Sequence, residues 1–411
     1  MLMRLDAKTV PTSTVSKTTL TSTSPTASTS ATAPTAAATT MTAVANAPHA
    51  AVATSVGGRV VAVPGALHAV KIAGRDVEIM LPVGTSLPRY LELLNTSGAF
   101  TAQQAELDTL ATLATSSAPI ATSSSSNDKR PVVGIVLSEP KMLVPGQHKN
   151  TETLLILVEA MGCRAVLIPP CADIAVGGGP LVRQRAIGAM AGMLDGLVGP
   201  GGADVDPSIY GKDNTHSLHT NVLRDRFETD FVKTALDADL FGFGICRSHQ
   251  LWNAAAGGSL IQDVQHEEVV SVSHKEGHHP VIVEQKSMLY EEVRQRALRV
   301  NSLHHQAVDL EGWGFRVTAR HTDGHTGKSM IEATERWNGI TTQFHPELMQ
   351  DNGAHRALFS TLGRRAHVFA ALKRMGAPTM RALVAHLKSD DRFVASDLDW
   401  CKRELGRRLQ P

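Results

Sequence analysis

From residue 131 onwards, short apolar runs alternate with longer segments in which apolar residues recur at helical spacing. Proline, glycine or serine bounds each run, as is typical of buried strands; the runs cover residues 132–137, 162–170, 196–202 and 240–246. The segments that separate or follow them predict helices over 150–161, 180–192, 224–238 and 248–256. This alternation predicts a mostly parallel sheet with helices on both faces.

Later segments are richer in strand patterns, which predict an antiparallel extension of the sheet; they cover residues 279–284, 315–320, 329–334 and 339–344. After residue 362 the chain predicts basic helical stretches over 364–375, 379–387 and 396–409. We expect residues 363–411 to form a helical extension, either a cap on the domain or a small appendage that binds a partner.

The N-terminal part has a different composition. Residues 1–50 hold 20 serines and threonines and one acid, Asp6, so they cannot bury enough apolar surface to offset their ordering entropy. We expect a disordered leader over 1–56, a hairpin and helix segment over 57–115 and a serine-rich linker over 116–130. Within the second segment, the turn is expected at 74–76 and the helix at 101–114. The folded domain then covers 131–362.

Charge and length exclude several classes of protein. With 40 Lys and Arg against 39 Asp and Glu, the net charge of +1 argues against a nucleic-acid binder. No stretch reaches the roughly 20 apolar residues that span a bilayer, so no membrane protein is expected. The leader lacks the apolar core of a secretory signal. We expect a cytoplasmic protein, with organelle targeting or secretion as a host-directed effector as the alternatives.

The four cysteines (Cys163, Cys171, Cys246 and Cys401) form no zinc pattern and no disulfide framework. Cys246 differs from the others because it follows an apolar strand and precedes a helix. A nucleophile at such a turn is lifted out of the sheet, and the helix N-terminus favours the reactive thiolate. The ordinary role of a lone cysteine is that of a small buried hydrophobe, which we expect for Cys163 and Cys171.

Two more features follow predicted strands. His345 lies two residues before Glu347, so the carboxylate can hold one imidazole nitrogen while the other faces a nucleophile; the alternative is an ordinary surface histidine. The glycine-rich loop over 199–204 can direct an amide N–H into the same site, where the N–H of Arg247 would be a second oxyanion donor. The alternative for this loop is a phosphate cradle, although its spacing fits neither known phosphate-binding pattern.

Several ordered motifs carry a resemblance to a known family. They are the segments 199–207 with 210–211, 224–228, 244–247, 250–253, 257–263, 300–308 and 343–347. Over residues 131–362 the chain resembles the class I glutamine amidotransferase-like superfamily, and within it the γ-glutamyl-γ-aminobutyrate hydrolase family of cysteine peptidases. The resemblance implies a flavodoxin-like α/β fold, a mostly parallel sheet flanked by helices.

The resemblance also implies roles for individual residues. Cys246 is the expected nucleophile, His345 the base and acid, and Glu347 the group that orients the histidine. Gly202 and Arg247 are the expected oxyanion-hole amides. Family-typical residues that either bind substrate or support the structure are His304, Arg224, Asp225 and Gln250. Neither a metal nor an organic cofactor is implied.

Two features depart from the family pattern. Ser248 stands where the family usually has glycine, so its hydroxymethyl group either crowds the turn or forms a local hydrogen bond. The connection over 323–333, from Asp-Gly to Ile-Glu-Ala, is longer than the one that the family usually has.

The expected activity is hydrolysis of γ-glutamyl amides through a thioester on Cys246. The expected partner is a small-molecule γ-glutamyl substrate, and the question of a homodimer is left open. One alternative is a glutaminase that supplies ammonia to a partner synthase. The other is a secreted effector or binding protein that uses the same fold.

Overall fold

The computed structural model describes residues 53–56, 59–62, 65–72, 75–97, 118–119, 128–143, 148–176, 179–374 and 394–408. Every structural statement below refers to these residues. Three sequence-based predictions lie wholly or largely outside them: the leader before residue 53, the helix over 101–114 and the helix over 379–387. Of the predicted linker, only 118–119 and 128–130 are described.

A parallel core of six strands forms the centre of the sheet, which confirms the predicted α/β class. In spatial order these are β16 (Gly339–Thr342), β9 (Phe241–Ile245), β8 (Gly196–Gly199), β6 (Val132–Val136), β7 (Arg164–Ile168) and β4 (Arg75–Pro82). The carboxyl ends of β8, β9 and β16 therefore meet at one edge, where the three candidate motifs begin.

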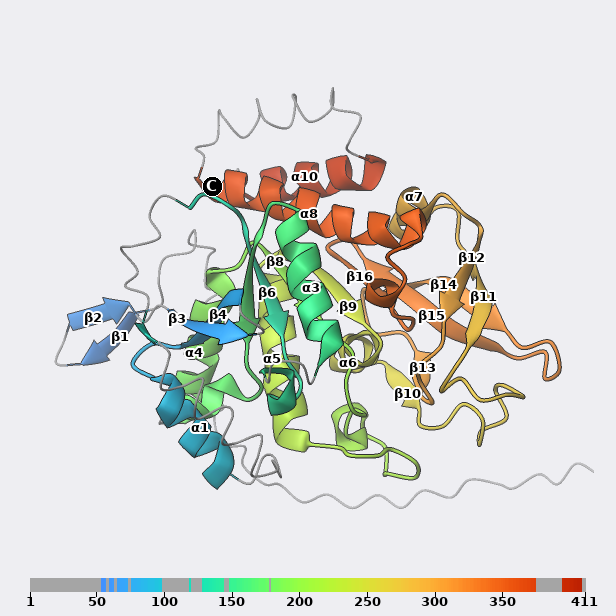
Figure 1. Cartoon of the computed structure of the whole chain (residues 1–411), viewed down its shortest axis with the longest axis horizontal. Helices are drawn as coiled ribbons and strands as arrows, with labels where there is room; N and C mark the ends of the chain where they lie inside the picture. The colour runs from blue at the N-terminus through green and yellow to red at the C-terminus, as the bar shows by residue number, and fades with distance from the viewer. Residues whose placement is uncertain are drawn as a thin grey trace, which may run out of the picture. The chain divides into compact units, whose positions relative to one another are not determined.

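Helices cover both faces of this core (Figure 1). On one face lie α3 (Lys149–Ala160) and α8 (Gly353–Arg374), which pack on each other. On the other face lie α4 (Pro180–Gly192), α5 (Val222–Asp237) and α6 (Arg247–Ala255). Alternation along β9 shows the two faces, because Phe243 contacts Phe359 of α8 while a Cβ at Gly242 would meet Trp252 of α6.

The hairpin predicted after the leader is present and extends the central sheet. Strand β3 (Gly65–Ile72) pairs antiparallel with β4, which pairs with β7, and β5 (Ala118–Pro119) pairs with β3. The predicted turn at 74–76 was too wide, because β4 already starts at Arg75. Helix α1 (Leu87–Thr96) was not predicted; Ser86 caps it by accepting a hydrogen bond from the Arg89 amide.

One boundary of the predicted leader was wrong. Residues 53–56, assigned to the disordered leader, form strand β1 (Ala53–Val56), which pairs antiparallel with β2 (Arg59–Ala62). The leader had been assigned from its average composition, which hid the short run Ala-Thr-Ser-Val with its strand-favouring Thr and Val.

The antiparallel extension is confirmed and is larger than predicted. Strands β11 (His278–Val283), β14 (Arg316–Thr322) and β15 (Ser329–Arg336) continue the sheet beyond β16. The sequence had not indicated β10 (Ser259–Ile261), β12 (Ala297–Asn301), β13 (Ala307–Leu310) or helix α7 (Met288–Val293). Short 3-10 turns cover Pro140–Leu143, Ala172–Ala175, Pro207–Tyr210 and Pro346–Leu348.

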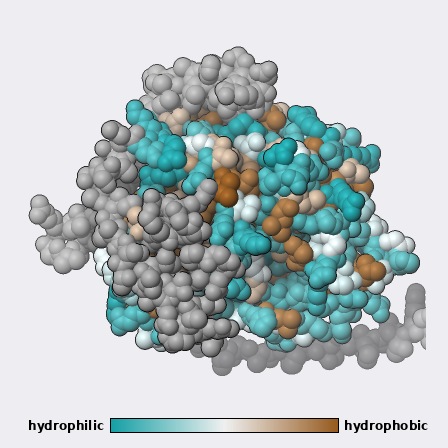
Figure 2. All heavy atoms as spheres, in the orientation of Figure 1, coloured by the Kyte–Doolittle hydropathy of each residue, from teal (hydrophilic) through white to brown (hydrophobic). Residues whose placement is uncertain are grey.

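Two C-terminal helices pack against each other. Helix α8 begins at Gly353, before the predicted start at 364, and α10 (Ala395–Arg408) lies on it. Asp397 accepts hydrogen bonds from Arg364 Nε at 2.7 Å and Arg365 Nε at 2.6 Å. Trp400 is buried beside them. No described helix is long and apolar enough to cross a membrane, and the face in Figure 2 is mostly hydrophilic with small, separated apolar groups.

The Asp397 ion pair provides a stability test. Asp397→Ala is expected to lower the free energy of unfolding by about 3–5 kcal/mol, because it leaves the fully buried Arg365 guanidinium without its carboxylate. Asp399→Ala on the same helix is the matched control: its partner Lys402 and the carboxylate are both exposed, so the loss should stay below about 1 kcal/mol. Urea unfolding followed by circular dichroism measures both, and equal losses would contradict the buried-pair assignment.

Candidate active site

Cys246 lies on a strained turn between β9 and α6. Its backbone has φ 50° and ψ −104°, a region that non-glycine residues rarely occupy. Two backbone hydrogen bonds hold it there: the Cys246 amide donates to the Thr342 carbonyl at 2.7 Å, and the Gln250 amide donates to the Cys246 carbonyl at 3.2 Å. The sequence predicted a strand that ends at Cys246 and a helix after it, and the structure has both; the role of nucleophile stays a prediction.

His345 and Glu347 follow β16 at the same edge. His345 Nδ1 lies 2.7 Å from Glu347 Oε1, so an ionised carboxylate accepts a hydrogen bond from Nδ1–H and leaves Nε2 free for another group. Asn301 holds the histidine backbone from both sides: its Nδ2 donates to the His345 carbonyl at 2.9 Å, and the His345 amide donates to its Oδ1 at 2.8 Å. The sequence analysis had not identified Asn301.

The imidazole of His345 also lies beside Cys246: a Cβ built at Gly201 would lie 3.4 Å from His345 Nε2 and 3.5 Å from Cys246 Cβ. Burial on its own would lower the pKa of His345. The charges of Cys246 and Glu347 and their hydrogen bonds outweigh burial, and they hold the pKa of His345 well above its usual value. The arrangement therefore favours an imidazolium beside the sulfur, the environment that activates a thiolate.

The other cysteines lie in a different environment. Burial raises the pKa of the Cys163 and Cys401 thiols to about 12 and raises that of Cys171 as well. These thiols stay protonated at neutral pH and pack as small hydrophobes.

The glycine-rich loop after β8 is pressed against this pair. A Cβ built at Gly201 would lie 2.7 Å from His345 Cε1 and 3.5 Å from Cys246 Cβ. A Cβ at Gly202 would lie 2.3 Å from Ser138 Oγ and 3.0 Å from Arg247 Cδ. Only glycine allows the backbone to come this close. The two segments that carry the expected oxyanion donors, Gly202 and Arg247, therefore both lie next to Cys246.

Ser248, the departure from the family pattern, is accommodated by a hydrogen bond. Its buried Oγ donates to the Pro200 carbonyl at 2.8 Å. The space comes from Gly199, where a Cβ would lie 2.4 Å from that oxygen. The hydroxyl thus ties the helix after Cys246 to the glycine-rich loop.

Arg224 and Asp225 lie in a buried network of charges beneath the turn. Asp225 Oδ1 accepts from Arg224 Nε at 2.8 Å and from Arg247 Nη2 at 2.5 Å, and Arg247 Nη1 donates to Glu228 at 2.5 Å. Asp225 also accepts from the Asp206 amide at 2.6 Å. Both residues are almost fully buried, so these contacts favour the supporting reading over the substrate-binding one.

Gln250 is linked to the Cys246 sulfur by hydrogen bonds through a second glutamine, Gln343, which the sequence analysis did not single out. Gln250 Nε2 donates to Gln343 Oε1 at 3.1 Å, and Gln343 Nε2 donates to Cys246 Sγ at 3.6 Å. Gln250 also donates to the Gln306 carbonyl at 3.2 Å. Gln343 opens the Gln-Phe-His-Pro-Glu segment, which was the available signal.

His304, the fourth of the family-typical residues, faces a different group. Its Nε2 lies 3.7 Å from Glu332 Oε1, and its Nδ1 lies 2.9 Å from the Gln306 carbonyl. It joins a cluster of histidines described below.

The raised pKa of His345 generates a test of thiol reactivity. His345→Gln is expected to slow alkylation of Cys246 by iodoacetamide at pH 6–7 about tenfold or more, because the thiolate loses its imidazolium. Glu347→Gln removes one of the charges that raise the pKa of His345, so the imidazolium is lost at a lower pH and the rate at pH 6–7 falls as well. Peptide mass spectrometry measures the rates, with Cys163, Cys171 and Cys401 as unreactive internal controls; identical rates in all three proteins would contradict the pairing.

Comparison with known proteins identifies a family and several relatives. Residues 131–347 match the family described as Peptidase C26. The glutamine amidotransferase-like protein YvdE of Lactococcus lactis subsp. lactis is 35% identical over 178 residues, which cover 41% of this chain and 72% of that protein. The protein NtpR of Enterococcus hirae is 32% identical over 190 residues, which cover 44% and 78%.

A more distant relative has a more specific name. The γ-glutamyl-γ-aminobutyrate hydrolase PuuD of Escherichia coli K12 is 26% identical over 233 residues, which cover 53% of this chain and 85% of that protein. The family match includes the strained turn at Cys246, the glycine-rich loop and the segment that ends at Glu347. The chain therefore belongs to the Peptidase C26 family, within the glutamine amidotransferase-like superfamily.

Proposed function

We propose that this chain is a hydrolase that cleaves γ-glutamyl amide bonds, with Cys246 as nucleophile. The observation that carries the proposal is the placement of Cys246 on a strained turn, beside an imidazole that Glu347 orients. Nucleophile, base and orienting carboxylate are the parts that acyl transfer from an amide requires.

The first half of the reaction forms a thioester. The Cys246 thiolate attacks the γ-carbonyl carbon, and the carbonyl oxygen takes the negative charge of the tetrahedral intermediate. The Gly202 and Arg247 amides would donate to that oxygen; one such donor typically contributes about 2.7–4 kcal/mol of barrier lowering. The intermediate collapses as the carbon–nitrogen bond breaks, and the His345 imidazolium gives its proton to the leaving amine.

The second half returns the enzyme to its starting state. Neutral His345 removes a proton from water, and the hydroxide adds to the thioester carbon. The carbon–sulfur bond then breaks, which releases the γ-carboxyl group of glutamate and the Cys246 thiolate beside a protonated His345. These steps use side chains and backbone amides of this chain alone.

The acyl half of the substrate is supported by the relatives. The E. coli hydrolase is named for a γ-glutamyl amide, whereas the Lactococcus protein is named as glutamine amidotransferase-like. Both names fit a γ-glutamyl acyl group and differ in the amine that leaves. A glutaminase that supplies ammonia to a partner synthase is therefore the second candidate, supported by the higher identity of the Lactococcus protein.

Loss of the nucleophile tests the first proposal. Cys246→Ala is expected to abolish release of glutamate from γ-glutamyl substrates, because no other described cysteine has an imidazole partner. Mass spectrometry of the wild-type protein with slow substrates should detect a γ-glutamyl adduct on the peptide that contains Cys246. Cys163→Ala is the matched control and should retain turnover. Unchanged turnover in Cys246→Ala would refute the assignment.

The leaving group is tested by a substrate panel. We expect kcat/KM for γ-glutamyl conjugates of small amines, γ-glutamyl-γ-aminobutyrate among them, to exceed that for glutamine by about tenfold or more. Such a ratio corresponds to roughly 1.4 kcal/mol of selective transition-state binding. A preference for glutamine of the same size would instead support the glutaminase.

A further inference from the structure

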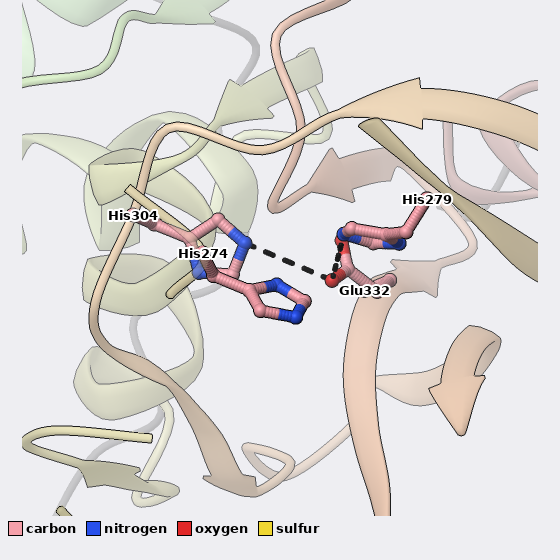
Figure 3. A group of neighbouring side chains, drawn as sticks. All are labelled: His274, His279, His304 and Glu332. Atoms are coloured by element: carbon pink, nitrogen blue, oxygen red, sulfur yellow. Dashed lines mark ion pairs between the residues drawn. The ribbon is translucent and has the colours of Figure 1, made fainter. Parts of the chain in front are cut away.

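Four side chains from the antiparallel extension converge on one point beside the candidate active site (Figure 3). His274 precedes β11, His279 lies on β11, His304 lies between β12 and β13, and Glu332 lies on β15. Each offers one ligand atom, and these atoms all lie within 4.8 Å of one another. His279 Nε2 and His304 Nε2 lie 3.3 Å and 3.7 Å from Glu332 Oε1.

The polar atoms at this point are buried and lack hydrogen-bond partners. They are His274 Nδ1, His279 Nε2, His304 Nε2 and both carboxylate oxygens of Glu332. Glu332 is completely buried, and His274 and His304 are 4% and 6% exposed. Buried polar groups are normally paired, so five orphans aimed at one point require an explanation.

The hydrogen bonds made by Nδ1 of His304 and of His279 show which ring nitrogen carries the proton and which carries a lone pair. A carbonyl oxygen can only accept, so the contact of His304 Nδ1 with the Gln306 carbonyl places the proton on Nδ1 and a lone pair on Nε2. The contact of His279 Nδ1 with the Pro280 carbonyl, at 3.4 Å, has the same consequence. Lone pairs of His279 and His304 therefore face the oxygens of Glu332.

Lone pairs that face carboxylate oxygens repel one another. A bound cation would remove this repulsion, whereas a shared proton would remove only part of it. A protonated Glu332 could donate to a single imidazole, which would satisfy two of the five atoms. In the described part of the chain, no Lys or Arg forms an ion pair with Glu332, whose ion-pair contacts are with His279 and His304. Four ligand atoms around one positive ion would all be satisfied.

The electrostatic environment is consistent with metal ligands. Burial lowers the pKa of His274 to about 4 and that of His279 to about 3, and it holds the pKa of His304 well below its usual value. All three are therefore neutral at pH 7, the form that binds metal. Burial raises the pKa of Glu332, so a bare carboxylate is unfavourable there without a nearby positive charge.

We propose that His274, His279, His304 and Glu332 form a binding site for one divalent transition-metal ion, with zinc as the metal that fits best. Three imidazoles and one carboxylate form a four-ligand zinc set, and a set with four protein ligands is typical of structural sites. Ligand atoms about 2.05 Å from a tetrahedral ion lie about 3.3 Å apart, close to the two distances above. The expectation of no metal rested on the spacing of the cysteines and on the family resemblance, and this site uses no cysteine.

The surrounding hydrogen bonds preorganise the site. The His304 amide and Ser302 Oγ donate to the His274 carbonyl at 2.9 Å and 2.7 Å, so the two ligand loops are joined without the ion. His304 donates to Gln306, which provides the outer hydrogen bond that usually orients a metal-binding imidazole. This role does not depend on the proposed hydrolase activity.

The test is direct metal binding by the full chain. After chelator treatment, titration with Zn²⁺ followed by calorimetry and elemental analysis should give one ion per chain, and Co²⁺ should give the intense visible bands of a four-coordinate site. Zn²⁺ should also raise the melting temperature. The absence of stoichiometric binding by the folded wild-type protein at micromolar Zn²⁺ would overturn the proposal without any variant.

Variants locate the ion. His279→Gln and Glu332→Gln should each weaken Zn²⁺ binding roughly 100-fold or more, since outer contacts alone contribute about 10–100-fold. His278→Gln is the matched control, because His278 precedes His279 on β11, points to the opposite face and is exposed. Circular dichroism establishes that each variant is folded. Equal Zn²⁺ affinity in the wild type and both ligand variants would place the ion elsewhere and refute the assignment.

Discussion

The parallel pairing of β9 with β16 is the constraint on which the rest of the site depends. Its register places Ile245 opposite Thr342, so that the next residue of one strand is Cys246 and the segment after the other leads to His345. The hydrogen bond from the Cys246 amide to the Thr342 carbonyl continues that ladder into the turn. A shift of one strand by one residue would turn its side chains to the opposite face of the sheet and separate the sulfur from the imidazole.

A second constraint comes from charges buried beneath the turn. Arg247 contributes a backbone amide to the proposed oxyanion site, while its guanidinium is bound to Asp225 and Glu228. A buried ion pair adds little net stability over apolar packing, yet removing one partner is strongly destabilising. The network is thus better understood as a device for positioning: it joins α5, the start of α6 and the loop around Asp206.

Much of the fold and part of the site could be predicted because their signals are local. An apolar strand that ends at Cys246 and is followed by a helix occupies a short stretch of sequence, as does the segment from Gln343 to Glu347. The contacts of Asn301 and Glu332 gave no such local signal, although Asn301 lies in the motif over 300–308, since their partners lie 44 and 28 or more residues away in the chain. Helix α1 has only 10 residues and β1 only 4, and β1 was counted within the leader on the average composition of that segment, so neither gave a clear signal.

The positive φ of Cys246 lowers the stability of the folded protein at the position that carries the thiol. Glycine adopts that region without steric cost, whereas a side chain there costs of order 1–3 kcal/mol. The chain keeps a thiol at the position where its own backbone would favour having no side chain at all. Folding stability and the presence of a thiol therefore favour different residues at this one position. The packing around Cys246 has to offset the free-energy cost of its backbone conformation.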